Sequence, residues 1–212
     1  MLRLVLCGVA GVAHASGPTQ GNDPLPPEAR SWMTTLRKEP PEIRAKALLA
    51  KMNQTEKLAM LHGIGAGYVG NVQGNTRLGI PQLNLNDGPQ GFRGTSGTST
   101  AWPAALSVAA SWSEETMFAW GKGMGEEFFA KGSNVQLGPG VCLARVPVNG
   151  RNFEYLSGED PTLGAALTRA YVLGVQSAGV AAVVKHFALN HQETSRNDES
   201  SIADERTLFE AY

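Results

Sequence analysis

The stretch VAAVVKHFALNHQETSRN, residues 180–197, joins an uninterrupted apolar run to a dense group of polar side chains. The run Val180–Val184 lacks the period-two alternation of a half-buried strand, which is typical of a parallel strand covered on both faces. Lys185 and His186 follow it directly, an ending that suits a polar cavity better than a buried strand. Because adjacent strand residues point to opposite faces, we expect a bulge or unusual peptide geometry at residues 185–187 if both side chains enter one cavity.

Two earlier segments show the same order of strand and polar turn. A short strand containing Leu83 and Leu85 ends at Asp87-Gly88-Pro89, and a second strand over residues 134–137 ends at Gly138-Pro139-Gly140. Glycine and proline at these places favour turns, because both residues interrupt regular strand geometry. We therefore expect three strands, each followed by a loop that carries polar groups.

Helices are expected between and after these strands. Ser113 is a predicted N-cap, and the helix that follows it carries a stripe of apolar residues at helical spacing. Asp160-Pro161 and Asp204 are expected to begin two more helices. Residues 41–63 read as a helix in two pieces, the second capped by Thr55, and residues 63–79 as a glycine-rich loop. The expected core stripe consists of Met117, Trp120, Met124 and Phe128.

Strand–helix alternation at this spacing predicts an α/β fold with a parallel sheet and right-handed crossovers. The polar residues gather after the strands, which is where (β/α)8 barrels place their chemistry. The sequence indicates about three strand–helix units, whereas a closed barrel has eight. The prediction is a partial (β/α)8 TIM-type barrel, about the first half only.

The first residues have the pattern of a secretory signal. Arg3 precedes an apolar run, and Ala13-His14-Ala15 is a small-x-small cleavage pattern. We expect residues 1–15 to be a signal peptide, 16–40 a linker or N-terminal extension, and 41–212 an incomplete barrel domain of a secreted protein. Asn53-Gln54-Thr55 is a glycosylation sequon, which is weak evidence by itself.

Composition and charge disfavour several functions. The formal net charge is −1 and hydrophobic residues make up 42% of the chain, so no basic surface for nucleic acid or a membrane is expected. With Cys7 inside the expected signal peptide, the remaining Cys142 makes neither a disulfide nor a zinc site. The segment 94–100, GTSGTST, lacks the Gly-Lys-Ser/Thr ending of a phosphate loop.

Three motifs, in order along the chain, carry a family resemblance. They are LNDGPQGFR at 85–93, LGPGVCLARVPVNGRNFEYLSGEDP at 137–161 and KHFALNHQETSRN at 185–197. Together they resemble the N-terminal domain of glycoside hydrolase family 3, the β-glucosidase and β-xylosidase family. The resemblance covers most of the chain after about residue 45, and it implies a barrel that hydrolyses glycosidic bonds with retention of configuration.

The resemblance also implies a set of sugar-binding residues. Asp87 and Arg93 would line the subsite for the cleaved sugar, Arg151 would be the arginine of its GRNFE motif, and Lys185 and His186 would bind hydroxyls of that sugar. Arg196 would help position and ionise the catalytic carboxylate. A sugar ring offers many hydroxyls, so acceptors facing donors suit it, and hydrogen bonds to charged groups contribute about 1.5–3 kcal/mol each. No cofactor or metal is implied, because two carboxylates and a water suffice.

Read singly, the same residues have plainer explanations. Asp87 before Gly-Pro is most often a turn aspartate, and a lone Arg151 is more often a surface ion-pair partner. Glu193 is as well explained as a solvated charge in a loop as it is by a ligand-binding role. His62 and His191 belong to no motif and receive no role.

The catalytic pair itself is not expected among these residues. In the family that this chain resembles, the nucleophile is an aspartate after a later barrel strand, and the acid/base lies beyond the barrel. We therefore expect the 212-residue chain to be inactive alone. Together with the rest of the barrel and a C-terminal domain, it should act on a β-linked oligosaccharide or glycoside. It is expected to contact neither nucleic acid nor membrane.

Two alternatives remain. One is a non-catalytic secreted carbohydrate-binding protein, completed by a partner or a second copy. The other is the β-N-acetylglucosaminidase branch of the same family, where Pro-Gly-His usually follows Lys-His-Phe. Ala188-Leu189-Asn190 stands there instead, which disfavours that branch.

Overall fold

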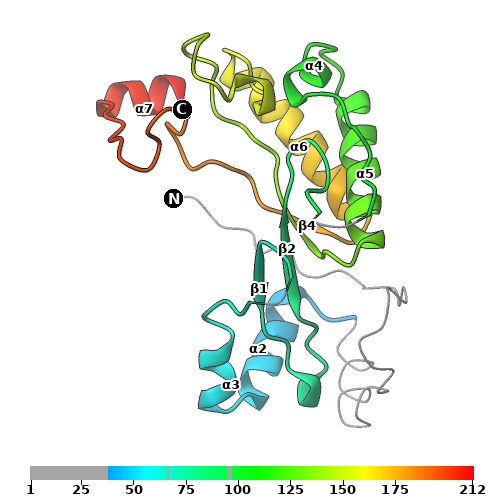
Figure 1. Ribbon diagram of the computed structural model, residues 1–212. Helices are drawn as coiled ribbons and strands as arrows, with labels where there is room; N and C mark the ends of the chain where they lie inside the picture. Colours follow the sequence, from blue (N-terminus) through cyan, green and yellow to red (C-terminus); the bar gives the residue numbers. More distant parts are fainter. Residues whose placement is uncertain (1–37, 66, 95–96) are drawn as a thin grey trace.

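The computed structural model describes residues 38–212 except residues 66, 95 and 96 (Figure 1). The expected signal peptide, residues 1–15, lies outside the described residues. So does the expected extension up to residue 37.

Helices and strands alternate along most of the described chain. The helices and strands that the sequence predicts are present, and the short 3-10 helices η1 and η2 occur in two of the loops. The elements are α2 Pro41–Lys51, α3 Gln54–Ala59, β1 Gly70–Val72, η1 Thr76–Leu78, β2 Leu83–Asp87, α4 Ala105–Ala109, α5 Glu114–Ala130, β3 Val135–Leu137, η2 Asn152–Glu154, α6 Pro161–Ser177, β4 Ala181–Ala182 and α7 Glu205–Ala211.

The strands form one sheet in the order β1-β2-β3-β4. β2, β3 and β4 are parallel, with Leu85 opposite Val135 and Val135 opposite Ala181. Each parallel step crosses over through a helix, α5 between β2 and β3 and α6 between β3 and β4. The structure confirms the predicted α/β fold with a partial TIM-type barrel.

β1 corrects the expectation of a loop over residues 63–79. It pairs antiparallel with β2, with Gly70 opposite Leu85. The buried Asn71 side chain donates from Nδ2 to Oδ1 of Asn84 at 2.9 Å, so the hairpin is held by side chains as well as backbone. Figure 1 shows β1 and β2 extending from the helical layer toward α2 and α3.

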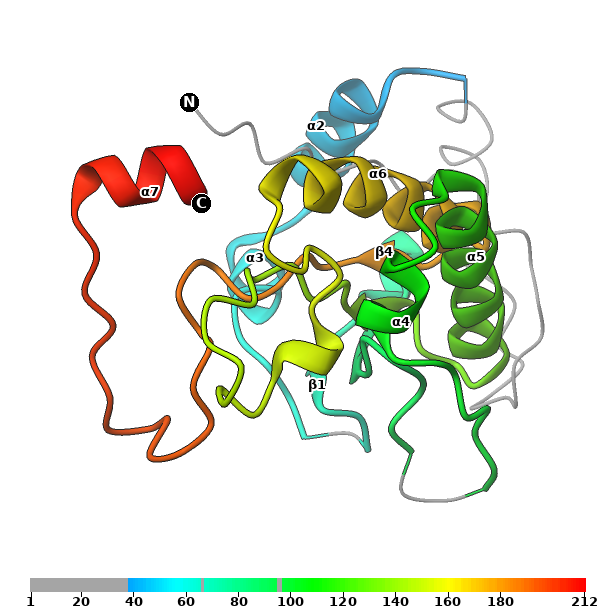
Figure 2. The same cartoon turned by 90° about the horizontal axis from the view of Figure 1, so that it is seen from above.

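The core lies between the sheet and helices α5 and α6. Figures 1 and 2 show these two helices side by side, with α4 at one end. The predicted stripe is confirmed, because its four residues are buried and join one apolar cluster with α6 residues such as Tyr171 and Val175. Trp120 and Tyr171 stack edge to face, with ring centroids 5.2 Å apart.

Side-chain caps begin the helices at most of the predicted places. Ser113, Asp160 and Asp204 each accept a hydrogen bond from a backbone N–H in the first turn of α5, α6 and α7. The expectation for α3 was wrong by two residues, because Asn53 rather than Thr55 is its cap. Asn53 and Glu56 form a reciprocal capping box, which satisfies two backbone donors at once.

The third strand is shorter and less buried than its apolar sequence predicts. Only Ala181–Ala182 pairs as a strand, and the side chains of Val183 and Val184 are 40% and 48% exposed. Within the described chain β4 pairs only with β3, so it forms an edge of the sheet. The expected cover on both faces is therefore not found here.

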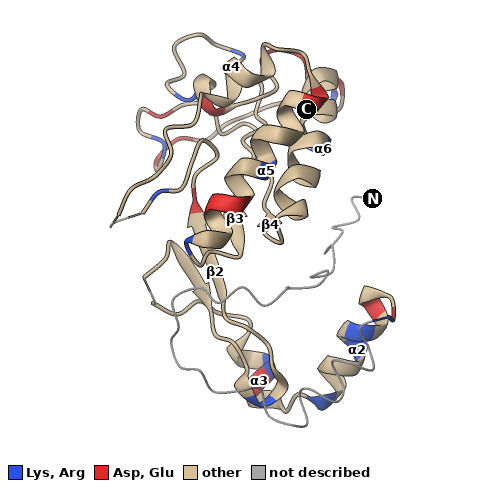
Figure 3. Cartoon of the chain, turned by 90° about the vertical axis from the view of Figure 1, so that its right-hand side faces the viewer, with Lys and Arg blue, Asp and Glu red and all other residues tan. Residues whose placement is uncertain are grey.

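Charged residues of both signs are distributed over the described chain, with Lys and Arg grouped on α2 (Figure 3). Among the described helices, none is both long enough and apolar enough to cross a membrane.

Candidate functional site

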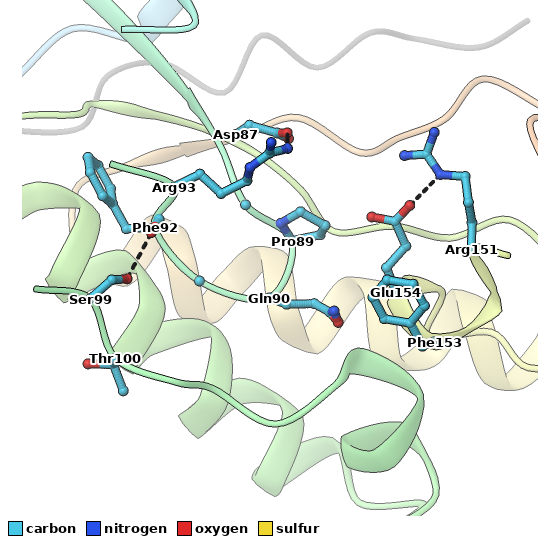
Figure 4. Close-up of a pocket in the computed structure, with 12 residues that line it drawn as sticks. Asp87, Pro89, Gln90, Phe92, Arg93, Ser99, Thr100, Arg151, Phe153 and Glu154 are labelled. Atoms are coloured by element: carbon cyan, nitrogen blue, oxygen red, sulfur yellow. Dashed lines mark hydrogen bonds and ion pairs between the residues drawn. The ribbon is translucent and has the colours of Figure 1, made fainter. Parts of the chain in front are cut away.

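An open cavity of about 330 Å³ lies at the carboxyl ends of the parallel strands (Figure 4). Its walls come from segment 87–93 after β2, from Ser99 and Thr100 in the next loop, and from residues around η2, including Phe153. The volume falls within the range of small-molecule sites. This is the edge of the sheet at which the sequence analysis placed the polar residues.

Asp87 ends β2 and is held by two cations. Nζ of Lys185 donates to its Oδ1 at 2.7 Å, and Nη1 of Arg93 donates to its Oδ2 at 2.5 Å. Burial favours the neutral acid, but the hydrogen bond and charge of Lys185, together with Arg93, outweigh it and lower the pKa of Asp87. Asp87 is therefore an anionic hydrogen-bond acceptor at neutral pH.

Arg151 and Glu154 form a second, more buried ion pair on the opposite wall (Figure 4). Nε of Arg151 donates to Oε1 of Glu154 at 2.6 Å, and their side chains are 12% and 11% exposed. The one-turn helix η2 makes this contact, because it brings residues three apart onto one side. Burial lowers the pKa of Arg151, but the hydrogen bond and charge of Glu154 outweigh it and raise the pKa.

Lys185 and His186 follow β4 and are joined by a cis peptide bond. This confirms the predicted unusual peptide geometry at residues 185–187. Neither side chain lines the cavity directly, yet each contacts a residue that does. Lys185 donates to Asp87, and Nε2 of His186 lies 3.5 Å from Nη2 of Arg151.

His186 is neutral near pH 7. Burial, and then the positive charges of Arg151 and Lys185, lower its pKa to about 4. Its Nδ1 lies 3.1 Å from the hydroxyl of Tyr155. The imidazole is therefore fixed between an arginine and a buried phenol.

The structure brings five of the six predicted residues together. Asp87, Lys185 and Arg93 form one cluster, and Arg151 and His186 form the other. The sixth, Arg196, is half exposed and pairs with Glu193 at 3.3 Å. Glu193 also contacts Arg151 at 3.3 Å, so this carboxylate connects Arg196 to the site.

Sequence reasoning missed two buried residues that shape the site. Neither Glu154 nor Tyr155 was assigned a role from the sequence. The Arg-x-x-Glu spacing of Arg151 and Glu154 was a usable signal for an ion pair within one helical turn. Tyr155 gave no such signal, because it contacts His186, a residue 31 positions away.

The wall formed by Ser99 and Thr100 is anchored by Glu127 of α5. Oε1 of Glu127 accepts from the backbone N–H of Thr100 at 3.0 Å, and Oε2 accepts from Nε1 of Trp102 at 2.9 Å. Both oxygens are thus used by N–H donors. Burial raises the pKa of Glu127, but these hydrogen bonds and the charge of Lys131 outweigh it and lower the pKa.

The arrangement brings carboxylate acceptors and cationic donors together beside one cavity. It suits a ligand with many hydroxyl groups, because each hydroxyl both donates and accepts. Among the residues that the structure describes, no group of three or more His, Cys, Asp or Glu side chains is placed to hold a metal ion.

The low pKa of His186 predicts a specific pH dependence. A histidine in an unfolded chain titrates near pH 6.5, whereas His186 in the folded chain should titrate near pH 4. Between these values the unfolded chain binds a proton that the folded chain does not. The contribution of neutral His186 to the free energy of unfolding is therefore fully present above about pH 6.5. It decreases as the pH falls toward 4. A proton NMR titration of the His186 ring checks this, and a midpoint at or above 6.5 contradicts it.

Glu127→Gln is expected to loosen the Ser99–Thr100 wall. The amide offers one oxygen to two N–H donors, so either the exposed Thr100 N–H or the partly buried Trp102 Nε1–H faces another donor, at a cost of about 1 kcal/mol. Urea unfolding measures the loss. Glu126→Gln is the matched control on the same helix, because Glu126 is exposed and its contact with Lys122 is 3.8 Å. Equal losses in the two variants would show that Glu127 does not anchor the wall.

Comparison with known proteins identifies the family of this chain. The family model described as "Glycosyl hydrolase family 3 N terminal domain" matches residues 47–211. Beta-glucosidase BoGH3A of Bacteroides ovatus is 40% identical over 186 residues, covering 82% of this chain and 24% of that protein. Thermostable beta-glucosidase B of Acetivibrio thermocellus is 39% identical over 181 residues, covering 80% of this chain and 23% of that protein.

Solved structures give the same result. DesR, a beta-glucosidase from Streptomyces venezuelae in complex with D-glucose, matches with a TM-score of 0.75 and 38% identity, covering 79% of this chain and 22% of that chain. Beta-glucosidase 3B from Thermotoga neapolitana in complex with alpha-D-glucose matches with a TM-score of 0.66 and 35% identity, covering 71% of this chain and 24% of that chain. The chain thus spans about a quarter of the length of these relatives. With this match over residues 47–211, the chain belongs to glycosyl hydrolase family 3 and carries sequence of its N-terminal domain.

Proposed function

We propose that this chain supplies the sugar-binding part of a retaining, exo-acting β-glucosidase pocket, which releases a terminal β-linked sugar. The observation that carries the proposal is Asp87, held ionised by Lys185 and Arg93 beside the cavity. The relatives are β-glucosidases, and both of the solved structures described above hold glucose.

The side chains divide into acceptors and donors for ring hydroxyls. Asp87 accepts, and Lys185, Arg93 and Arg151 donate. Each charged hydrogen bond contributes about 1.5–3 kcal/mol, and contacts that tighten at the transition state also accelerate the reaction. Arg196 approaches the same cavity through Glu193 and would orient a catalytic carboxylate.

The catalytic carboxylates are proposed to come from other segments of the enzyme. Retaining glycosidases need a nucleophile and a protonated acid about 5–5.5 Å apart. Asp87 has a lowered pKa, so it is a poor proton donor, and Glu154 is bound to Arg151. The N-terminal pattern around Arg3 and Ala13-His14-Ala15 supports secretion as a further part of this proposal.

Two assays on the purified 212-residue chain test the proposal. Calorimetric titration should detect weak glucose binding, because only part of the pocket is present. Incubation with an aryl β-glucoside should release no phenol. Absence of glucose binding would refute the proposed role of this cavity.

A second outcome would also refute the proposal. If the homogeneous chain hydrolyses the glucoside and Asp87→Ala removes this activity, the catalytic groups lie within these residues. If glucose binds only to a defined oligomer of the chain, the non-catalytic carbohydrate-binding alternative is favoured instead.

A further inference from the structure

Tyr155 is buried and uses its only hydrogen on the backbone. Its hydroxyl donates to the carbonyl oxygen of Asn190 at 2.6 Å, and its side chain is fully buried. Burial raises the pKa of this phenol, so it stays protonated over the physiological range. The hydroxyl has no second hydrogen, and any other partner must donate to its oxygen.

That second partner is Nδ1 of His186, 3.1 Å from the Tyr155 oxygen. The thiol of the nearby Cys142 donates to the carbonyl oxygen of His186 at 3.6 Å, so its one hydrogen is used there. For the Tyr155–His186 contact to be a hydrogen bond, Nδ1 must carry the proton. A neutral imidazole has one N–H, so Nε2 is then left with a lone pair.

The position of Arg151 agrees with this assignment. Nη2 of Arg151 is always a donor, and it lies 3.5 Å from Nε2 of His186. A proton on Nε2 would bring two donors together. The tautomer therefore satisfies the partners on both sides of the ring.

We infer that Tyr155 is a positioning residue, which fixes His186 in the Nδ1–H tautomer so that Nε2 accepts from the guanidinium of Arg151, a residue that lines the cavity. This deepens the proposed function and rests on it for the identity of the ligand. The single lone pair of Nε2 faces Arg151, so His186 orients this guanidinium at the cavity, where Arg151 donates to sugar hydroxyls in the proposed function. The tautomer thus gives Arg151 an acceptor in a cluster rich in donors.

Long-range proton–nitrogen NMR of the labelled 212-residue chain at pH 7.5 tests the tautomer directly. In the wild type, Nδ1 of His186 should have the shift of a protonated ring nitrogen and Nε2 that of an unprotonated one. In Tyr155→Phe, Nδ1–H loses its acceptor, and the population should move toward Nε2–H, the form that a free imidazole favours. Glucose affinity should fall roughly three- to tenfold, the effect of one hydrogen bond.

Tyr171→Phe is the matched control. Tyr171 is another buried tyrosine, but its hydroxyl contacts Gln136 and Met124 instead of His186. It should lose comparable stability and leave the His186 shifts and the glucose affinity unchanged.

The outcomes separate this inference from the proposed function. An Nε2–H tautomer in the wild type, or identical His186 shifts in wild type and Tyr155→Phe, would overturn the inference. The expected shifts in a chain that does not bind glucose would support the positioning role of Tyr155 and refute the proposed sugar site.

Discussion

Asp87→Asn should weaken glucose binding by the 212-residue chain about 10- to 100-fold, the largest functional effect expected of a single substitution here. The carboxylate is the acceptor held by Lys185 and Arg93. An amide keeps the shape but loses the charge, and charged hydrogen bonds are worth about 1.5–3 kcal/mol. It also leaves two cations facing a neutral group. Calorimetric titration with glucose measures the effect.

Asp160→Asn is the control for this substitution. Asp160 caps α6, where asparagine serves about as well, and it lies outside the cavity lining. The glucose affinity of the Asp160→Asn variant should equal that of the wild type. Equal affinity in Asp87→Asn and wild type would show that Asp87 does not contact the sugar.

The same substitution should change the pH dependence of stability. The folded-state pKa of Asp87 is lowered, so its ion pairs stabilise the fold above the unfolded value, about 3.9. This contribution is lost as the pH falls through the lower folded value. The Asp87→Asn variant should lack that acid-sensitive contribution.

Gly174→Ala should produce the largest loss of stability. Gly174 lies on α6 against the backbone of α5, and an added Cβ would lie 2.3 Å from the carbonyl oxygen of Phe118 and 2.8 Å from the amide nitrogen of Lys122. Backbone atoms cannot rotate away as a side chain does, so the helices must separate. We expect a loss of about 3 kcal/mol or more, or roughly 10 °C in Tm.

Gly65→Ala tests whether the effect is steric. No atom lies within 4 Å of the Cβ that this change would add, so only the entropy of the unfolded chain changes. Gly65→Ala should be neutral or slightly stabilising. Thermal unfolding compares the two variants, and similar melting temperatures would contradict the close packing of α5 on α6.

Local chemistry in the sequence was enough to place most helices. Ser113, Asp160 and Asp204 were found because a cap acts within three residues of its own position. The start of α3 was predicted two residues too late, because Asn53 and Thr55 are both acceptable caps. The reciprocal bond from Glu56 makes Asn53 the better cap.

Features that depend on distant partners were predicted less well. β1 has a glycine-rich sequence and forms a strand only because it pairs with β2. Val183 and Val184 were expected to be covered, but burial depends on neighbouring elements, and β4 has one strand neighbour in the described chain.

The site residues required the family resemblance. By local pattern alone, Asp87 was a turn aspartate and Arg151 a surface ion-pair partner. The structure instead shows both beside the cavity, with Arg151 largely buried against Glu154. The peptide geometry at Lys185 and His186 was predictable from strand periodicity, whereas the role of Tyr155 needed three-dimensional contacts.

The central claim is that glucose binds at the cavity bounded by Asp87 and Arg151. The most direct measurement is an amide-shift map of the labelled 212-residue chain during glucose titration. The account predicts saturable changes confined to residues 87–93, 151–155 and 185–190, which are lost in Asp87→Asn. No saturable change, or changes confined to another part of the chain, would contradict it.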